Sequence, residues 1–276
     1  NEVDTYGEDQ YNALDAHTKS LHERAFQTNE NDPNYHLTEE ITFEGQPLRV
    51  PKGDILHQFR SDARNGKLPT VSWLVAPQNF SDHPSAPMYG AWYVSEVLNI
   101  LTENPEVWKK TIFILNYDEN DGYFDHIPPF VAPKPGAEHT GKLSPDLDAS
   151  NEYVFMEQEL QAGVSPENAT EGPVGLGYRV PLIIASPWTK GGWVNSDVCD
   201  ITSTIQFMEH FFAEKYGKPI VEENISSWRR AVTSNLTSAF RTFEQKPTPL
   251  PSFLDRNTQV AAINKAKDLP APNGFK

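Results

Sequence analysis

The sequence predicts an α/β fold in which a mostly parallel sheet has helices on both faces. Three short segments, 71–76, 111–117 and 180–185, are almost wholly apolar, which is typical of strands buried on both faces. Segments with apolar residues at helical spacing alternate with them along the chain. This alternation favours a parallel sheet, and it places bound ligands at the carboxyl ends of the strands.

Two helices are expected before the first strand. Residues 8–27 carry apolar side chains at helical spacing among polar ones, and a polar turn with Pro33 follows. Asp54 stands where a residue would cap the start of the second helix, and Gly66 stands where a glycine would end it. This second helix therefore leads into the strand at 71–76.

Three further helices are expected after the first strand. Residues 89–101 show helical spacing, and Asn104-Pro105 begins a short helix that ends at Trp108. After the last strand, a helix covers about residues 202–215. The side chains expected to form its buried stripe are Ile205, Met208, Phe211 and Phe212.

Two stretches lack a regular pattern. Residues 128–177 are rich in Pro, Gly, Ser and Glu, so we expect them to cross the active face or to form a partly ordered loop. Residues 246–276 are Pro-rich, and we expect a linker or a strap along the surface.

The composition and the lack of long apolar runs exclude several functions and structural features. The formal net charge of -15 repels nucleic-acid phosphates, so a general nucleic-acid-binding role is excluded. The single cysteine, Cys199, excludes an intrachain disulfide. No apolar run approaches the roughly 18 to 20 residues that cross a bilayer, so no transmembrane segment is expected. No signal peptide follows Asn1, and any export signal is expected upstream of it.

The main candidate site is the acidic segment 116–122, which follows the second predicted strand. Asp118 and Glu119 are neighbours at the end of an apolar strand, where carboxylates repel each other unless a cation lies between them. The segment therefore indicates a divalent metal ion held by these two side chains. The alternative is a solvated acidic turn, because Asp, Asn and Gly also favour turns for local backbone reasons.

Two histidines are candidates for catalysis. His83, in the segment 81–84, follows the first predicted strand on a loop that can direct it to the same crevice as Asp118, where it would act as an acid or bind an anion. His126 precedes the rigid segment Ile127-Pro128-Pro129. The alternatives are a capped surface residue for His83 and a packing role for His126.

Trp188 and Trp193 flank a Gly-Gly turn beyond the third predicted strand. Exposed aromatic faces there would hold a quaternary ammonium group by cation–π attraction, whereas the alternative for each ring is ordinary packing. The glycine-rich segment 172–177 is not expected to bind phosphate, because it precedes a strand instead of following one.

The motifs around these candidates resemble those of the bacterial phosphocholine-preferring phospholipases C. The similar segments are, in order, 69–77, 81–84, 116–126, 177–181 and 225–230. That family also includes acid phosphatases, and it is related to the alkaline-phosphatase superfamily. The resemblance covers about residues 50 to 240 and implies an alkaline-phosphatase-like fold. Residues 1–245 would then be the C-terminal portion of a phosphoesterase catalytic domain.

Carried over residue by residue, the resemblance implies that Asp118 and Glu119 bind the active-site metal. It also implies that His83 faces the phosphate and protonates the leaving alkoxide, while His126 matches the family's Asp-His-Pro-Pro segment. The implied substrate is a choline phospholipid such as phosphatidylcholine, which is hydrolysed to diacylglycerol and phosphocholine. Oxygen ligands favour calcium, magnesium or manganese over zinc. The implied location is secreted or periplasmic, in a bacterium.

Two departures from the family's pattern bear on activity. The family's N-terminal Glu-Asn-Arg-Ser-Phe-Asp-His motif, which supplies further metal ligands, is absent, and so is the segment with the Ser or Thr nucleophile. We therefore expect a C-terminal part that needs the missing N-terminal half of its own domain and is inactive alone. Ile201 stands where relatives have a histidine, although Asp200 can still cap the following helix.

Two other functions stay open. Within the family, the alternative is an acid phosphatase of broad specificity. From another class, the alternative is a non-catalytic module that binds lipid or carbohydrate. The Asp118-Glu119 pair and His83 count against such a module, because binding alone needs no metal-ready carboxylates at a strand end.

Overall fold

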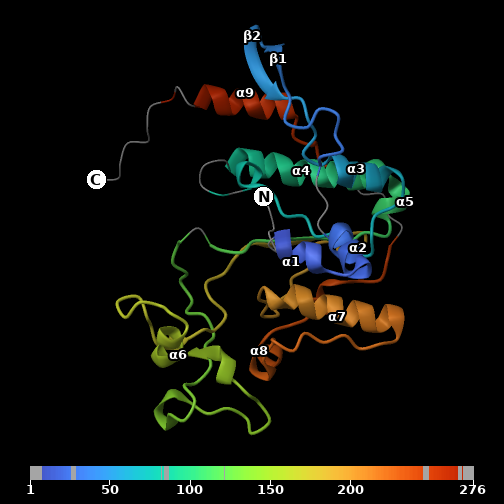
Figure 1. Cartoon of the computed structure of the whole chain (residues 1–276). Helices are drawn as coiled ribbons and strands as arrows, with labels where there is room; N and C mark the ends of the chain where they lie inside the picture. The colour runs from blue at the N-terminus through green and yellow to red at the C-terminus, as the bar shows by residue number, and fades with distance from the viewer. Residues whose placement is uncertain are drawn as a thin grey trace. The chain divides into compact units, whose positions relative to one another are not determined.

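The computed structural model (Figure 1) describes residues 8–25, 29–81, 83, 87–120, 122–244, 249–266 and 269. The chain divides into two compact units. Unit 1 comprises residues 1–111 and 246–276, and unit 2 comprises residues 112–245. The predicted mixture of helices and strands is confirmed. The strands of the described residues pair in antiparallel two-stranded sheets, and the mostly parallel sheet stays a prediction.

The N-terminal segment of unit 1 forms two helices where the sequence predicts one. They are α1 (Glu8–Ala13) and α2 (Ala16–Ala25). The break occurs at Asp15, because its carboxylate accepts hydrogen bonds from the backbone N–H and the hydroxyl of Thr18, at 2.9 and 2.7 Å. Asp15 therefore caps the start of α2, which the periodicity alone does not reveal.

A β-hairpin that the sequence analysis missed follows these helices. It consists of β1 (Thr38–Phe43) and β2 (Gln46–Pro51), which pair antiparallel. The turn residues Glu44 and Gly45 have φ values of 50° and 80°. A two-residue turn with positive φ at both positions matches the twist of a hairpin, so Gly45 is the local signal for this turn.

The described part of the C-terminal segment packs on this hairpin. Residues Arg256–Ala266 form α9, which lies beside β2 (Figure 1). Val260 of α9 forms a buried cluster with Leu48 and Val50. Leu254 donates its backbone N–H to the Ser95 hydroxyl at 2.9 Å. The segment therefore contributes to the core of unit 1.

The helices predicted between residues 54 and 108 are confirmed. They are α3 (His57–Arg64), α4 (Pro87–Glu103) and α5 (Pro105–Trp108). The predicted cap at Asp54 is wrong, because the residue before α3 is Leu56, whose side chain makes no capping hydrogen bond; Asp54 instead accepts the backbone N–H of Leu56 at 2.9 Å. Gly66 has the left-handed φ of 64° expected at a helix end. The residues that α4 buries are Gly90, Trp92, Tyr93, Val97, Ile100 and Leu101.

The predicted strand at 71–76 is wrong for this structure. The segment forms no ladder with another described strand, and Trp73 and Val75 are exposed. A strand that is apolar on both faces needs neighbouring strands to bond its backbone and layers to cover its side chains. The described strands of unit 1, β1 and β2, pair with each other and not with this segment.

The two other predicted strands are confirmed in unit 2. Residues Phe113–Asn116 form β3 and Leu182–Ala185 form β6. The two strands pair antiparallel, with Phe113 opposite Ala185 and Asn116 opposite Leu182. The backbone N–H of Tyr117 continues the pairing with a hydrogen bond to the carbonyl of Pro181 at 3.2 Å. This ribbon fixes the position where the acidic segment begins.

The last predicted helix is also confirmed, as α7 (Thr202–Tyr216). Its predicted buried stripe is wrong, because Ile205, Met208, Phe211 and Phe212 are only half-buried and the buried positions are Ser203 and Gln206. Both polar side chains have partners. The Ser203 hydroxyl accepts the N–H of Asp200 at 3.0 Å, and Gln206 donates to the Thr233 hydroxyl at 3.0 Å.

The segment 128–177 contains short elements instead of long ones. They are β4 (Tyr153–Val154), which pairs with β5 (Gly172–Pro173), and α6 (Met156–Gln161). The remaining elements of the described chain are α8 (Ser227–Val232) and 3-10 turns at Gln78–Phe80, Glu138–Thr140, Ser150–Glu152 and Thr237–Ala239. No described helix combines the length and apolar character needed to cross a bilayer.

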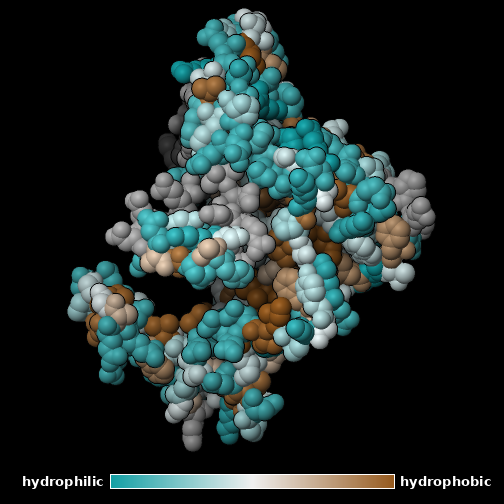
Figure 2. Space-filling model, turned by 45° about the vertical axis from the view of Figure 1, so that its right-hand side comes forward, coloured by the Kyte–Doolittle hydropathy of each residue, from teal (hydrophilic) through white to brown (hydrophobic). Residues whose placement is uncertain are grey.

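Apolar side chains reach the surface at several places, as the face drawn in Figure 2 shows. In unit 2 a group of them lies on the loop after β3. Its exposed members are Tyr123, Phe124, Ile127, Phe130 and Val131.

Candidate functional site

The acidic segment forms a defined turn directly after β3. Asn120 organises it, because its side chain accepts the N–H of Gly122 at 3.1 Å and donates to the carbonyl of Tyr123 at 2.5 Å. Gly122 has a φ of 75°, which suits glycine. Asp118 and Glu119 are both exposed. The turn therefore presents two adjacent carboxylates to solvent at the end of a strand.

These two carboxylates fit part of a metal site. Exposed carboxylate oxygens are the donors that calcium, magnesium and manganese prefer. Among the described residues, no group of three or more His, Cys, Asp and Glu side chains comes together to hold an ion. Asp121 lies outside the described residues. The divalent metal at Asp118 and Glu119 stays a prediction, and it requires further ligands.

Arg179 holds the next acidic residue of this loop, Asp125. The guanidinium donates through Nε to Oδ2 at 2.5 Å and through Nη2 to Oδ1 at 2.7 Å. The backbone N–H groups of Ile127 and Arg179 also donate to this carboxylate, at 3.3 and 3.4 Å. The hydrogen bonds from Arg179 hold the pKa of Asp125 far below its usual range. Asp125 is therefore a fixed negative charge at neutral pH.

His126 is presented to solvent beside this ion pair. Its side chain is 76% exposed, which excludes the packing role, whereas that of Asp125 is only 8% exposed. Nδ1 lies 3.1 Å from Nη2 of Arg179 and 3.2 Å from Oδ1 of Asp125. A neutral ring can accept from Arg179 at Nδ1, and a protonated ring can donate to Asp125 from the same atom. The ring therefore has polar neighbours at Nδ1, and most of its surface faces solvent.

His83 lies in unit 1 and is exposed. Its backbone N–H donates to the Ser81 hydroxyl at 3.3 Å, and that hydroxyl donates to the carbonyl of Gln78 at 2.9 Å. The neighbouring Asp82 and Pro84 lie outside the described residues. Because Asp118 belongs to unit 2, the crevice that His83 is predicted to share with it stays a prediction.

The two tryptophans predicted to hold an ammonium group differ in exposure. Trp188 is half-buried, with its ring 6.3 Å from that of Phe243. Trp193 is exposed, and the guanidinium of Arg241 lies 5.3 Å from the centre of its ring. Arg241 therefore occupies one face of Trp193 in this structure. A ligand cation at Trp193 would have to displace Arg241 or use the other face, and this binding role stays a prediction.

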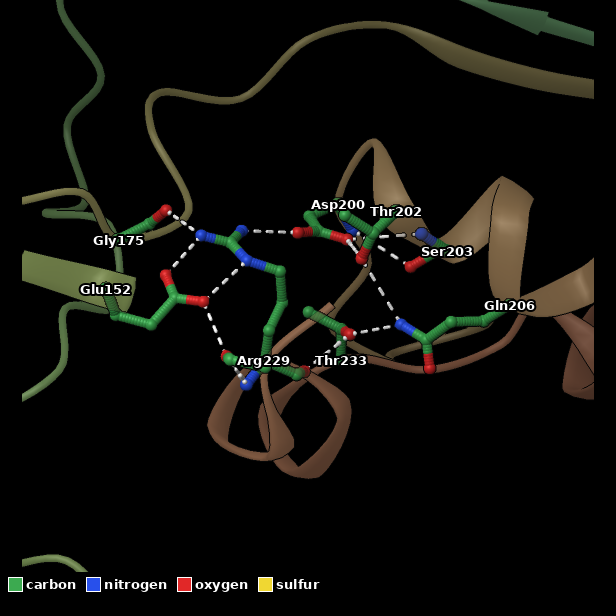
Figure 3. Close-up of polar contacts among 9 residues, drawn as sticks. Glu152, Gly175, Asp200, Thr202, Ser203, Gln206, Arg229 and Thr233 are labelled. Atoms are coloured by element: carbon green, nitrogen blue, oxygen red, sulfur yellow. Dashed lines mark hydrogen bonds and ion pairs between the residues drawn. The ribbon is translucent and has the colours of Figure 1, made fainter. Parts of the chain in front are cut away.

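An ion-pair network that was not predicted from the sequence lies in the interior of unit 2 (Figure 3). Arg229 of α8 donates through Nε and Nη2 to Glu152, at 3.0 and 2.5 Å, and through Nη1 to Asp200 at 2.6 Å. The carbonyl of Gly175 accepts a further bond from Nη2 at 2.7 Å. Ser226 donates to Glu152 at 2.6 Å. The network joins four segments that are far apart in the sequence.

The charged side chains of this network are buried, so each of them needs a partner of opposite charge. The side chain of Arg229 is 14% exposed, and those of Glu152 and Asp200 are each 4% exposed. Burial lowers the pKa of Arg229, but its bonds to the two carboxylates outweigh burial, so this pKa lies above the usual value. One signal was available, since Arg229 lies in the segment 225–230 and Asp200 precedes the helix at 202–215, but their pairing depends on the fold.

Comparison with known proteins gives consistent similarities. Residues 12–213 match the phosphoesterase family. Two similar proteins are named non-hemolytic phospholipase C. The one from Burkholderia pseudomallei is 46% identical over 189 residues, which are 68% of this chain and 25% of that protein. The one from Pseudomonas aeruginosa is 42% identical over 219 residues, which are 79% of this chain and 30% of that protein.

A more distant relative is phospholipase C B of Mycobacterium tuberculosis. It is 36% identical over 198 residues, which are 71% of this chain and 34% of that protein. The chain therefore spans only about a quarter to a third of the length of these relatives.

Proposed function

The chain belongs to the phosphoesterase family, and we propose that it forms part of a phospholipase C that hydrolyses a choline phospholipid. The observation that carries this proposal is the turn after β3, which presents Asp118 and Glu119 side by side at the end of a strand. This turn lies within the region that matches the family. The names of the relatives support phosphodiester hydrolysis over the other reactions considered.

Each candidate residue has a task in such a reaction. Asp118 and Glu119 would hold a divalent metal ion, which when bound stabilises negative charge on the phosphoryl oxygens. Asp125 and Arg179 lie beside Nδ1 of His126, and this ring would accept or donate a proton in the reaction. His83 would donate a proton to the leaving alkoxide of the lipid. The nucleophile and further ligands would come from a segment that this sequence does not contain.

The proposed substrate class rests on the net charge of the chain and on the relatives that are named phospholipase C. A net charge of -15 disfavours an anionic headgroup and favours a zwitterionic one such as phosphocholine. Trp188 and Trp193 would contact its ammonium group. Exposed Phe124 and Phe130 on the loop after β3 are suited to contact with lipid or with the rest of the catalytic domain. We further propose that the protein acts outside the cytoplasm, as a secreted or periplasmic enzyme.

The test is a comparison of variants in the full-length protein that contains this sequence. Asp118→Asn and Glu119→Gln are expected to lower turnover of phosphatidylcholine by roughly 10²- to 10³-fold, the usual effect of losing a charge-stabilising group. Both side chains are exposed, so the melting temperature should not change. Glu223→Gln, which removes another exposed carboxylate of unit 2, is the matched control.

Two results would overturn the proposal. Unchanged turnover in both variants would exclude the role of the acidic turn. Hydrolysis of simple phosphate monoesters without any hydrolysis of phosphatidylcholine would instead assign the protein to the acid phosphatases.

A further inference from the structure

Lys134 places its ammonium group between two aromatic rings and a carboxylate in unit 2. Nζ lies 5.4 Å from the ring centre of Tyr153 and 6.0 Å from that of Phe155. It also donates to Oε1 of Glu171 at 2.5 Å. The two rings lie 5.0 Å apart and are tilted by 51°. Two aromatic rings and one negative charge therefore converge on one cation.

The strand pairing holds these groups in place. Tyr153 pairs with Pro173, and Val154 pairs with Gly172. The next step of this antiparallel register brings Phe155 and Glu171 together. The Tyr153 hydroxyl also donates to the same oxygen of Glu171, at 3.5 Å. The rings and the carboxylate thus lie on β4 or directly beside β4 and β5, whereas Lys134 reaches them from a loop.

An open hollow adjoins this cluster. Its volume is about 450 Å³, and its lining consists of Phe155, Glu157, Gln158, Gln161 and Glu171. The lining contains two carboxylates and no basic side chain. A positively charged group of moderate size therefore has both the space and the charge complementarity to approach Phe155 and Glu171.

We propose that Tyr153, Phe155 and Glu171 form a binding site for a quaternary ammonium group, and that Lys134 occupies this site in the absence of the ligand. Aromatic faces bind quaternary ammonium groups by cation–π attraction, and the carboxylate adds a charge of opposite sign. We name these three residues the aromatic–acidic site. This site does not include Trp188 or Trp193, which are the ammonium contacts predicted from the sequence. Binding to it does not depend on phosphodiester hydrolysis.

The ammonium group of Lys134 can leave this site. Its side chain is 35% exposed, so the ammonium group can move into water, where it is strongly hydrated. Ion pairs at such exposure contribute little to stability, and cation–π contacts at exposed sites are also weak. A trimethylammonium group is larger, has no N–H to hydrogen-bond with water, and therefore gains more from the rings.

The test measures binding of choline to the full-length protein that contains this sequence by titration calorimetry. The neutral isostere 3,3-dimethylbutan-1-ol, which has the same shape without the charge, is the reference ligand. We expect choline to bind and the isostere not to bind. Lys134→Met keeps most of the side-chain stem but removes the competing ammonium group, so choline should bind roughly two- to fivefold more tightly, which is the effect of one exposed cation–π contact.

Loss-of-site variants and a control complete the test. Phe155→Leu and Glu171→Gln should each weaken choline binding by a similar factor, provided that circular dichroism shows an unchanged fold. Lys215→Met is the charge-matched control, because Lys215 also lies over two rings, those of Phe211 and Tyr216, at 5.5 and 5.3 Å. It should leave choline binding unchanged. Equal binding of choline and the isostere, or full binding in folded Phe155→Leu, would overturn the proposal.

A separate arm of the experiment identifies the molecule that carries the ammonium group. Phosphocholine in solution and vesicles of phosphatidylcholine carry the same headgroup, and vesicles of phosphatidylglycerol lack it. Binding of phosphocholine alone indicates a soluble ligand or product, and flotation with phosphatidylcholine vesicles indicates a lipid headgroup. Because no arm measures turnover, failure of the proposed hydrolysis would not be confused with failure of this site.

Discussion

The guanidinium of Arg229 donates to both carboxylate oxygens of Glu152, which lies 77 residues earlier in the chain. The same group donates to Asp200 at the start of α7. One cation thus closes the segment 128–177 onto two helices of unit 2. Because these carboxylates are almost wholly buried, their charge is tolerated only while the guanidinium pairs with them.

Arg229→Met is expected to lower the free energy of unfolding by about 3–5 kcal/mol, because it leaves two buried carboxylates without their cation. Arg229→Lys should recover only part of this loss, since an ammonium group cannot bond Glu152 and Asp200 with the geometry of a guanidinium. Urea unfolding measures both. The control is Arg230→Met, which breaks a more exposed pair with Glu209 and should cost only about 1 kcal/mol. Equal losses at positions 229 and 230 would contradict the argument.

The Asp125–Arg179 pair predicts a specific dependence of stability on pH. Hydrogen bonds from Arg179 lower the pKa of Asp125 in the folded state, so the folded state binds its proton less readily than the unfolded state. The stabilisation is therefore complete above the unfolded pKa of about 4, and it is lost as the pH falls toward the folded pKa. We expect the difference in unfolding free energy between the wild type and Asp125→Asn to be constant from pH 7 to 5 and to shrink below pH 4.

Arg179→Met supplies the check on this pH dependence. Removal of the guanidinium takes away the main cause of the lowered pKa of Asp125. The effect of Asp125→Asn on the unfolding free energy should therefore change much less with pH when it is measured in the Arg179→Met background. Unfolding curves at each pH for the four proteins measure the effect. A difference that stays the same from pH 6 to 3 would show that Arg179 does not stabilise the charged form of Asp125.

The packing of α9 on the hairpin predicts that the C-terminal segment stabilises unit 1. Val260 is buried with Leu48 and Val50, so Val260→Ala should lower the free energy of unfolding by about 1–3 kcal/mol. Lys265→Ala, on the exposed part of the same helix, should change it by less than about 0.5 kcal/mol. Thermal unfolding measures both variants. If the two substitutions had the same small effect, the segment would act only as a linker.

Local patterns predicted much of the secondary structure. The apolar runs at 111–117 and 180–185 contain β3 and β6, and the periodic segments at 89–101 and 202–215 are α4 and α7. These elements are visible because each pattern depends on neighbours in the sequence. The run at 71–76 shows the limit, because an apolar run indicates a strand only where other strands are available to pair with it.

The relationships that matter most for the site are not local. Arg229 reaches Glu152, Arg179 reaches Asp125, and Lys134 reaches Glu171 over separations of 77, 54 and 37 residues. Charge alone does not identify these partners, since the chain has 38 acidic residues. The acidic turn was predictable for the opposite reason. Asp118 and Glu119 are adjacent, and their position depends only on the strand before them.

The turn beside Trp193 gives a last prediction, because it depends on a glycine. Gly191 has a φ of 115°, and a Cβ atom there would lie 2.6 Å from Nε1 of Trp193. That nitrogen donates to the carbonyl of Lys190 at 3.1 Å, and Arg241 lies over the ring. Gly191→Ala should therefore displace the indole and cost about 1–3 kcal/mol of stability, since it adds backbone strain to a steric clash.

The matched control is the next residue, Gly192, where an added Cβ would have no atom within 4 Å apart from those of its two chain neighbours. Gly192→Ala should leave both the stability and the environment of the indole unchanged. Near-ultraviolet circular dichroism reports the tryptophan environment, and thermal unfolding reports the stability. Identical spectra for the two variants would show that Gly191 does not hold Trp193 in position, and the predicted contact of this ring with a ligand ammonium group would then lose its structural support.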